Sequence, residues 1–203
     1  MSKVTETRID ILRHGACEGG EIFRGSTDVA LSDLGWQQMR NKVAGLGEVH
    51  WDHIVSSPLQ RCQRFAEELA EQKAAPLTVR SDLREMHFGE WEGLPHAEAR
   101  QRFPQEWSQF WESPAEASPP NGEAMPDFCQ RITSELDTIA DDHQGQSVLL
   151  VVHGAVIRVM MCHFLGMPMG AMTRINVPYA GLSRFRVYHQ EGKAPWVQLG
   201  SHS

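Results

Sequence analysis

The run Val148-Leu149-Leu150-Val151-Val152 is apolar throughout and is followed directly by His153-Gly154. A strand that is apolar on both sides is typical of the centre of a parallel sheet whose two faces are covered by helices. The apolar residues that come next recur at helical spacing and predict a helix. They are Val156, Ile157, Met160, Met161 and Phe164. This stretch therefore predicts a buried strand, a turn that carries a histidine, and a helix, which together indicate an α/β fold.

An earlier segment repeats this pattern near the start of the chain. Ile9-Asp10-Ile11-Leu12 predicts a strand that ends at Arg13-His14-Gly15. Leu31-Ser32-Asp33 offers an N-cap for the helix that follows, whose apolar residues recur at helical spacing until Gly47. A histidine again comes directly after a predicted strand.

A third unit lies between these two. His53–Ser56 predicts a strand, and Ser57-Pro58 is expected to open a helix with Arg61 in its first turn. Ligands of open α/β sheets bind beyond the carboxyl ends of the strands. We therefore expect the polar residues that follow the three strands to lie close together.

The rest of the chain contains two more helical patterns and two more strands. Helices are predicted over residues 95–111 and 126–143, and strands over 182–188 and 196–199 at a sheet edge. The alternation of strands and helices predicts a three-layer α/β/α sandwich with a mostly parallel central sheet. We expect residues 1–203 to form a single domain, because one core suffices for a chain of this length.

The first of these helical patterns carries several aromatic side chains. They are Phe103, Trp107, Phe110 and Trp111. This spacing favours a helix face buried in the core over a surface that stacks on a flat heteroaromatic substrate.

The composition narrows the classes of function. Of the 203 residues, 26 are acidic and 19 are Lys or Arg, which gives a formal charge of −7. Nucleic-acid binding and binding to anionic membranes are not expected, because both need a basic surface. Neither a signal peptide nor a membrane-spanning apolar stretch is seen, and the four cysteines are scattered, so we expect reduced thiols and a cytoplasmic location. The sequence leaves open whether the protein is a monomer or a homodimer.

Several common catalytic motifs are absent from the sequence. They include the Gly-rich nucleotide-binding loops, the G-x-S-x-G serine motif, H-E-x-x-H and the C-x5-R phosphate loop. The chemistry must therefore come from His, Arg and Glu. Arg13, His14, Arg61 and His153 form a set of cationic donors at strand and helix ends, which suits a phosphoryl group with its three equatorial oxygens.

Four segments resemble, in order, the motifs of the histidine phosphatase superfamily, also called the phosphoglycerate mutase-like family. They are Leu12-Arg13-His14-Gly15, Ser56-Ser57-Pro58-Leu59-Gln60-Arg61-Cys62, Leu83-Arg84-Glu85-Met86-His87-Phe88-Gly89-Glu90-Trp91-Glu92-Gly93 and His153-Gly154-Ala155. The resemblance spans residues 9 to about 165. It implies the phosphoglycerate mutase-like form of the three-layer fold.

The resemblance also implies a role for each matching residue. His14 would be the nucleophile that forms a phosphohistidine, which splits one difficult displacement into two. Arg13, Arg61 and His153 would hold the phosphoryl oxygens, and Glu85 would protonate the leaving oxygen and then activate water. These cationic side chains supply the electrostatic stabilisation, so neither a metal ion nor another cofactor is expected.

Two further expectations concern the surroundings of His14. A nucleophilic imidazole must be neutral, and we predict that the charges of Arg13 and Arg61 lower the pKa of His14. Backbone N–H groups from Gly154 onward would add donors for the substrate, because a helix is predicted to begin there.

The loop after His14 departs from the family pattern R-H-G-E-T-x-x-N. It reads Ala16-Cys17-Glu18-Gly19-Gly20 after Gly15, so the Glu, the Thr and the phosphate-binding Asn are missing. Arg24 is a candidate substrate-binding residue that compensates for this loss. The shortened loop leaves open whether Arg24 touches the phosphate.

The chain length and the residues of the motifs resemble those of the phosphatase branch of the family, in particular the α-ribazole phosphatases of cobalamin synthesis. No insertion precedes Pro120-Asn121-Gly122-Glu123-Ala124, unlike in the glycolytic mutases. The expected reaction is hydrolysis of a small phosphomonoester, with α-ribazole 5′-phosphate as the favoured substrate. Mutase-type phosphoryl transfer, a broad-specificity phosphatase and, because of the altered loop, a catalytically weakened binding protein are the alternatives.

Overall fold

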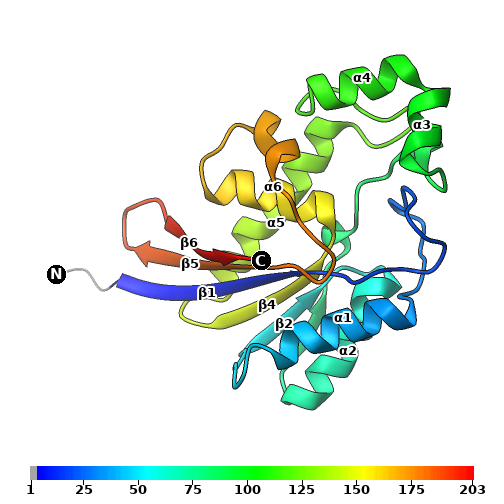
Figure 1. Cartoon of the computed structure of the whole chain (residues 1–203). Helices are drawn as coiled ribbons and strands as arrows, with labels where there is room; N and C mark the ends of the chain where they lie inside the picture. Colours follow the sequence, from blue (N-terminus) through cyan, green and yellow to red (C-terminus); the bar gives the residue numbers. More distant parts are fainter. Residues whose placement is uncertain (1–3) are drawn as a thin grey trace.

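A six-stranded sheet runs through the middle of the computed structural model, which describes residues 4–203 (Figure 1). Its strand order is β3-β2-β4-β1-β5-β6. The strands are β1 Val4–Arg13, β2 His53–Ser56, β3 Leu77–Val79, β4 Ser147–Val152, β5 Leu182–Gln190 and β6 Trp196–His202. The first four pair in parallel, and only β5 runs antiparallel to both of its neighbours. The prediction of a mostly parallel sheet is confirmed.

Helices cover both faces of this sheet. Helices α1 (Asp33–Ala44) and α2 (Gln60–Lys73) lie on one face, and α5 (Met125–Asp142) and α6 (Gly154–Phe164) lie on the other (Figure 1). The predicted three-layer sandwich is therefore present. Within the described residues, no helix has both the length and the apolar character that crossing a membrane requires.

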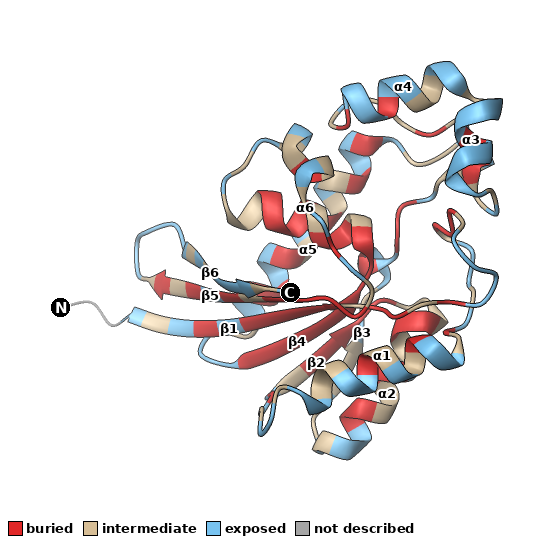
Figure 2. Cartoon of the chain, viewed as in Figure 1, coloured by how far each residue is buried: buried red, intermediate tan, exposed pale blue. Residues whose placement is uncertain are grey.

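Strand β4 shows why this sequence builds two layers of core. All six of its residues are buried, and Figure 2 shows the strand buried along its whole length. Val148, Leu150 and Val152 belong to the apolar cluster under α5 and α6. Leu149 and Val151 belong to the cluster under α1 and α2. Because side chains alternate between the faces of a strand, the continuous apolar run supplies both cores.

The carboxyl ends of β1, β2 and β4 meet at one edge of the sheet. Arg13 pairs in register with Val152, and Ser56 pairs with Val151. The residues that follow these strands therefore begin within the same small region, as the sequence predicts. This convergence positions the candidate site.

Residues 95–111, which are predicted as one helix, differ from the prediction. It forms two helices, α3 (His96–Arg102) and α4 (Pro104–Glu112), separated by Phe103 with φ −129° and ψ 57°. A proline disfavours the helical conformation at the preceding residue and lacks an N–H for the helical ladder, so Pro104 ends one helix and opens the next. The two short helices stand beyond the α5 and α6 layer (Figure 1).

Two further differences concern the sheet edges and the start of α2. The segment 182–188 was expected at an edge, but β5 lies between β1 and β6, and the edges are β6 and the unpredicted β3. Helix α2 begins at Gln60, two residues after Pro58, although Arg61 still lies in its first turn. The N-cap of α1 lies within the predicted segment 31–33: it is Ser32, whose side chain accepts a hydrogen bond from Gly35 N.

The loop after β1 and the first turn of α1 approach each other so closely that both need glycine. A Cβ atom on Gly35 would overlap the carbonyl group of Ala16, and one on Gly15 would overlap the backbone of Gly35. Since both neighbours are backbone atoms, neither can move aside without shifting the loop that carries His14.

We expect Gly35→Ala to destabilise the protein by about 1–3 kcal/mol, because it overpacks a backbone contact. A loss of stability would be diagnostic, because Gly→Ala inside a helix ordinarily raises the free energy of unfolding by up to about 1 kcal/mol. Urea unfolding followed by circular dichroism would measure the difference. Gly170→Ala is the matched control, because a Cβ atom at Gly170 meets no atom within 4 Å. A Gly35→Ala variant as stable as the wild type would contradict this account.

Candidate active site

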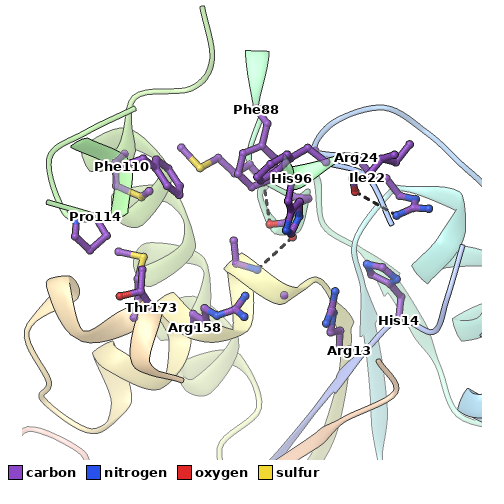
Figure 3. A pocket seen from close by; sticks show the side chains of 18 of the residues that line it. Arg13, His14, Ile22, Arg24, Phe88, His96, Phe110, Pro114, Arg158 and Thr173 are labelled. Carbon is purple, nitrogen blue, oxygen red and sulfur yellow. Dashed lines mark hydrogen bonds between the residues drawn. The ribbon is translucent and has the colours of Figure 1, made fainter. Parts of the chain in front are cut away.

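A cavity of about 290 Å³ opens where the three strand ends meet (Figure 3). Residues from the end of β1, the first turns of α2 and α6, the loop after His14 and the α4 region line it. The lining includes Arg13, His14, Arg24, Arg61, Glu85, Phe110, Trp111, Pro114, Gly154, Arg158, Thr173 and Tyr179. The structure therefore brings together four of the five predicted catalytic residues around one cavity.

His14 lies directly after β1 at the inner end of the cavity and is only 5% exposed. Its Nδ1 lies 2.8 Å from the carbonyl oxygen of Gly15. A carbonyl can only accept, so this contact assigns the proton to Nδ1 and leaves a lone pair on Nε2. The side chain is thereby held as the tautomer that a nucleophilic histidine needs.

Burial and charge both favour the neutral form of His14. Burial lowers its pKa well below the ordinary value, and the charges of Arg61 and Arg13 lower it further. The predicted direction is confirmed. Sequence analysis identified the two charges but not burial, the larger cause, because burial depends on how the loop after β1 packs.

Arg61 is 1% exposed and donates three hydrogen bonds, which reach two different segments. Its Nη1 donates to Thr27 O at 2.8 Å, its Nη2 to Gly25 O at 2.7 Å, and its Nε to His153 Nδ1 at 3.3 Å. The side chain thus ties the 25–27 loop to the strand end of β4 while lining the cavity. The predicted role of Arg61 in holding a phosphoryl oxygen stays a prediction.

The 25–27 loop is itself held by Glu92, which sequence analysis did not select. The carboxylate of Glu92 accepts hydrogen bonds from the backbone N–H groups of Ser26, Thr27 and Phe88 at 2.8–3.0 Å. Burial raises the pKa of Glu92, but these bonds and those from the Ser26 and Thr27 hydroxyls outweigh it and lower the pKa below its ordinary value. Glu92 therefore fixes the carbonyl groups to which Arg61 binds.

His153 lies behind the cavity instead of on its surface. It is fully buried, its Nδ1 accepts from Arg61 Nε, and its Nε2 lies 2.6 Å from Ser57 Oγ. Since Nδ1 accepts, Nε2 carries the proton and donates to Ser57. In this arrangement His153 orients Arg61, and both of its ring nitrogens are engaged. The contact of His153 with a phosphoryl oxygen stays a prediction. To make this contact, His153 would have to exchange its hydrogen bond with Ser57 or Arg61 for one with the substrate.

Arg13 lines the cavity beside His14 (Figure 3). Its Nη1 donates to Val177 O at 2.6 Å, and its guanidinium lies 4.1 Å from the centre of the Tyr179 ring. Its Nε is buried and has no partner among the described residues. A Cβ atom on Gly154 would lie 3.3 Å from this nitrogen, so Gly154 leaves room for the guanidinium at the start of α6.

Glu85 faces the same cavity and is 8% exposed. Its Oε1 accepts from Met86 N at 3.1 Å, and its Oε2 accepts from Ala155 N, in the first turn of α6, at 3.2 Å. These bonds fix the carboxyl group at the helix N-terminus, opposite His14. The expected helix start at Gly154 is confirmed, and one of its N–H groups is used to position Glu85.

Arg24 is buried and binds the loop that departs from the family pattern. Its Nη2 donates to Glu18 O at 2.9 Å and to Gly20 O, and its Nη1 donates to Ile22 O at 3.3 Å. The guanidinium thus stabilises this shortened loop. Its Nε has no partner among the residues that the structure describes, and Arg24 lines the cavity, so its contact with phosphate stays a prediction.

The aromatic residues of the α3–α4 segment only partly form the predicted buried face. Phe110 is buried and Phe103 and Trp107 are half-buried, but Trp111 is 42% exposed. Phe110 and Trp111 also line the outer part of the cavity. The break at Phe103 rotates the second helix relative to the first, so one face cannot hold all four residues.

Other predicted features concern cysteine and metal chemistry. The four cysteines are free, as predicted. Cys17 Sγ lies 3.6 Å from His14 Nδ1, and burial raises the pKa of the Cys17 thiol, which disfavours the reactive thiolate. Among residues 4–203, no group of three or more His, Cys, Asp or Glu side chains has the arrangement of a metal site.

Comparison with known proteins agrees with this geometry. The family model for the histidine phosphatase superfamily (branch 1) matches residues 9–198. A bifunctional protein of Mycobacterium tuberculosis is 34% identical over 189 residues, which are 91% of this chain and 51% of that protein. The chain therefore spans about half the length of this relative.

Relatives of similar length carry different substrate names. The glucosyl-3-phosphoglycerate phosphatase of Mycolicibacterium vanbaalenii is 32% identical, over 97% of this chain and 85% of that protein. The adenosylcobalamin/α-ribazole phosphatase of Escherichia coli is 27% identical, over 84% and 85%. The structure of a mycobacterial glucosyl-3-phosphoglycerate phosphatase in complex with VO3 superposes with a TM-score of 0.85 at 27% identity, over 96% of this chain and 97% of that chain.

We expect the His14 imidazole to titrate below the ordinary value of about 6.5, because burial and two neighbouring cations disfavour its charged form. In Arg13→Gln the pKa should rise, since one charge is removed, but should stay below the ordinary value because burial remains. Two-dimensional NMR of the imidazole nitrogens against pH measures both values, and His14→Asn assigns the signal. A wild-type pKa at or above the ordinary value would refute this view of the site.

Proposed function

The chain belongs to the histidine phosphatase superfamily, and on this premise we propose that it hydrolyses phosphate monoesters of small molecules through a phosphohistidine at His14. One observation carries the proposal. The Nδ1–H of His14 is bonded to Gly15 O, so the lone pair of Nε2 is available in a cavity lined by Arg13, Arg61 and Glu85.

In the first step, His14 Nε2 attacks the phosphorus atom and the bond to the ester oxygen breaks. Glu85, as the carboxylic acid, gives its proton to the leaving oxygen. Arg13 and Arg61 bind the equatorial phosphoryl oxygens, on which charge develops in the transition state. A metal-independent reaction is proposed because these cations supply the stabilisation.

In the second step, water attacks the phosphohistidine. The Glu85 carboxylate accepts a proton from this water, the bond between phosphorus and Nε2 breaks, and its electron pair returns to the imidazole. Inorganic phosphate leaves, and the enzyme is regenerated with Glu85 protonated. The hydrogen bonds from Met86 N and Ala155 N keep Glu85 in place during both steps.

The substrate is a separate proposal. The sequence favours α-ribazole 5′-phosphate, and a relative from Escherichia coli carries that name. Glucosyl-3-phosphoglycerate is the second candidate, because another relative carries that name at higher identity. The four free cysteines support a reducing location, for which we propose the cytoplasm.

We expect His14→Ala to abolish phosphate release from phenyl phosphate, α-ribazole 5′-phosphate and glucosyl-3-phosphoglycerate, assayed in excess EDTA. Glu85→Gln should slow turnover by about 10²–10⁴, because it keeps the shape of the side chain and removes the transferable proton. His50→Ala is the control, since the His50 side chain is exposed. Rapid quenching with a radiolabelled substrate should trap an acid-labile phosphoenzyme in the wild type and none in His14→Ala.

Other outcomes would identify the alternatives. Turnover that requires a bisphosphorylated primer would indicate a mutase. Tight binding of phosphomonoesters to the wild type without release of phosphate would indicate a binding protein. Phosphate release that survives His14→Ala would contradict the phosphohistidine route.

A further inference from the structure

Arg158 brings an additional guanidinium to the cavity that the proposed reaction steps do not use. It lies in the second turn of α6 and is the sole Lys, Arg, Asp or Glu in that helix. Its side chain points toward the cavity from the floor, on the side of Arg13 away from His14 (Figure 3). Burying a charged side chain costs free energy unless it is paired and hydrogen-bonded, so a residue of this kind in α6 calls for a partner.

Arg13 and Arg158 approach the same glycine from two sides. A Cβ atom on Gly154 would lie 3.3 Å from Arg13 Nε and 3.3 Å from Arg158 Nη1. Both guanidinium groups therefore lie close to the start of α6 at Gly154. Two like charges in a partly buried cavity repel each other, and an anion bound there would relieve this repulsion.

The hydrogen-bonding capacity of Arg158 is only partly used. Its Nε donates to Ile175 O at 2.9 Å, which fixes the direction of the side chain. Neither terminal nitrogen donates to any group in residues 4–203, and no carboxylate there forms an ion pair with Arg158. Burial lowers the pKa of Arg158 and the charge of Arg13 lowers it further, while the charge of Glu85 offsets part of this effect without a direct ion pair.

The neighbourhood of Arg158 lies at the leaving-group end of the cavity. Thr173, whose hydroxyl makes no hydrogen bond among the described residues, lies beside it, and Phe110 and Pro114 close the cavity beyond (Figure 3). His14 lies on the far side of Arg13. A phosphoryl group on His14 would thus occupy one end of the cavity, and the rest of the substrate would extend toward Arg158.

We infer that Arg158 binds a second anionic group of the substrate, a carboxylate or a phosphate on the part of the molecule that leaves. This inference rests on the proposed phosphatase function. The terminal nitrogens of Arg158 form the planar fork that suits either anion, and Thr173 offers a hydroxyl donor next to it. The substrate would then carry an anionic group in addition to the transferred phosphate. Of the two proposed substrates, this favours glucosyl-3-phosphoglycerate over α-ribazole 5′-phosphate, which the sequence alone favours.

Matched pairs of substrates test this directly. The pairs are 3-phosphoglycerate with glycerol 3-phosphate, 4-carboxyphenyl phosphate with phenyl phosphate, and propane-1,3-diol bisphosphate with 3-hydroxypropyl phosphate. We expect wild-type kcat/KM to favour the acidic member of at least one pair by about 10–100-fold, the range that a hydrogen bond to a charged group supplies. The first two pairs report a carboxylate, and the third reports a phosphate.

In Arg158→Gln this preference should vanish. For the neutral members, which are the compounds without a second anionic group, kcat/KM should change less than threefold. Arg158→Lys should keep part of the preference, because it keeps the charge and loses the fork. Arg174→Gln is the matched control, because it removes an exposed arginine from the neighbouring segment that carries Thr173. Thermal unfolding of each variant shows whether loss of the bond to Ile175 O has altered the fold, and Thr173→Val provides a second test without touching that bond.

The comparison can be repeated without turnover. Calorimetry would measure the affinity of each compound for His14→Asn and for the His14→Asn/Arg158→Gln double variant. An equal loss for both members of every pair would overturn the inference, because it would place Arg158 on the transferred phosphoryl group. Equal rates and affinities for acidic and neutral members in the wild type would also overturn it. Failure of the wild type to hydrolyse any of the six compounds would instead count against the proposed function, and calorimetry would still decide the role of Arg158.

Discussion

The buried guanidinium of Arg61 is the interaction on which the arrangement of the site depends. Its hydrogen bonds to Gly25 O, Thr27 O and His153 Nδ1 join three segments that are distant in the sequence. No carboxylate in the described part of the chain forms an ion pair with it. Backbone carbonyls therefore satisfy its N–H groups without neutralising its charge, and the positive potential remains available to the cavity.

The charge of Arg61 also affects the protonation state of His14. A carboxylate beside His14 would favour the imidazolium and remove the lone pair that catalysis needs. Instead, burial, Arg61 and Arg13 together disfavour protonation, and the carbonyl of Gly15 fixes which nitrogen keeps its proton. The same arginines that would attract an anionic phosphoryl group thus add to burial, the larger cause, in keeping the histidine neutral.

The sequence predicts the features that follow from local pattern. The apolar run of β4, the turn residues after each strand and the position of Arg61 in a first helical turn all depend on neighbours in the chain. What it misses depends on tertiary packing. The carboxylate of Glu92 acts on a loop more than sixty residues earlier, and the ring of His153 faces Ser57 and Arg61 instead of the cavity. Strand β3 has only three residues, which is too short for a recognisable pattern. The break at Phe103, in contrast, could be predicted from Pro104, because a proline disfavours the helical conformation of the preceding residue.

The arginine side chains of the cavity differ in whether their N–H groups are already hydrogen-bonded within the protein. The N–H groups without a partner are the ones available to a ligand. Arg24 and Arg61 use most of their donors on backbone carbonyls, so they shape loops as well as supply charge. Arg13 Nε and the terminal nitrogens of Arg158 are unpaired and lie on either side of Gly154. A Cβ atom at that position would lie only 3.3 Å from Arg13 Nε and from Arg158 Nη1, so a side chain there would crowd both guanidinium groups. The glycine that follows His153 therefore leaves space for both arginine side chains at the start of α6.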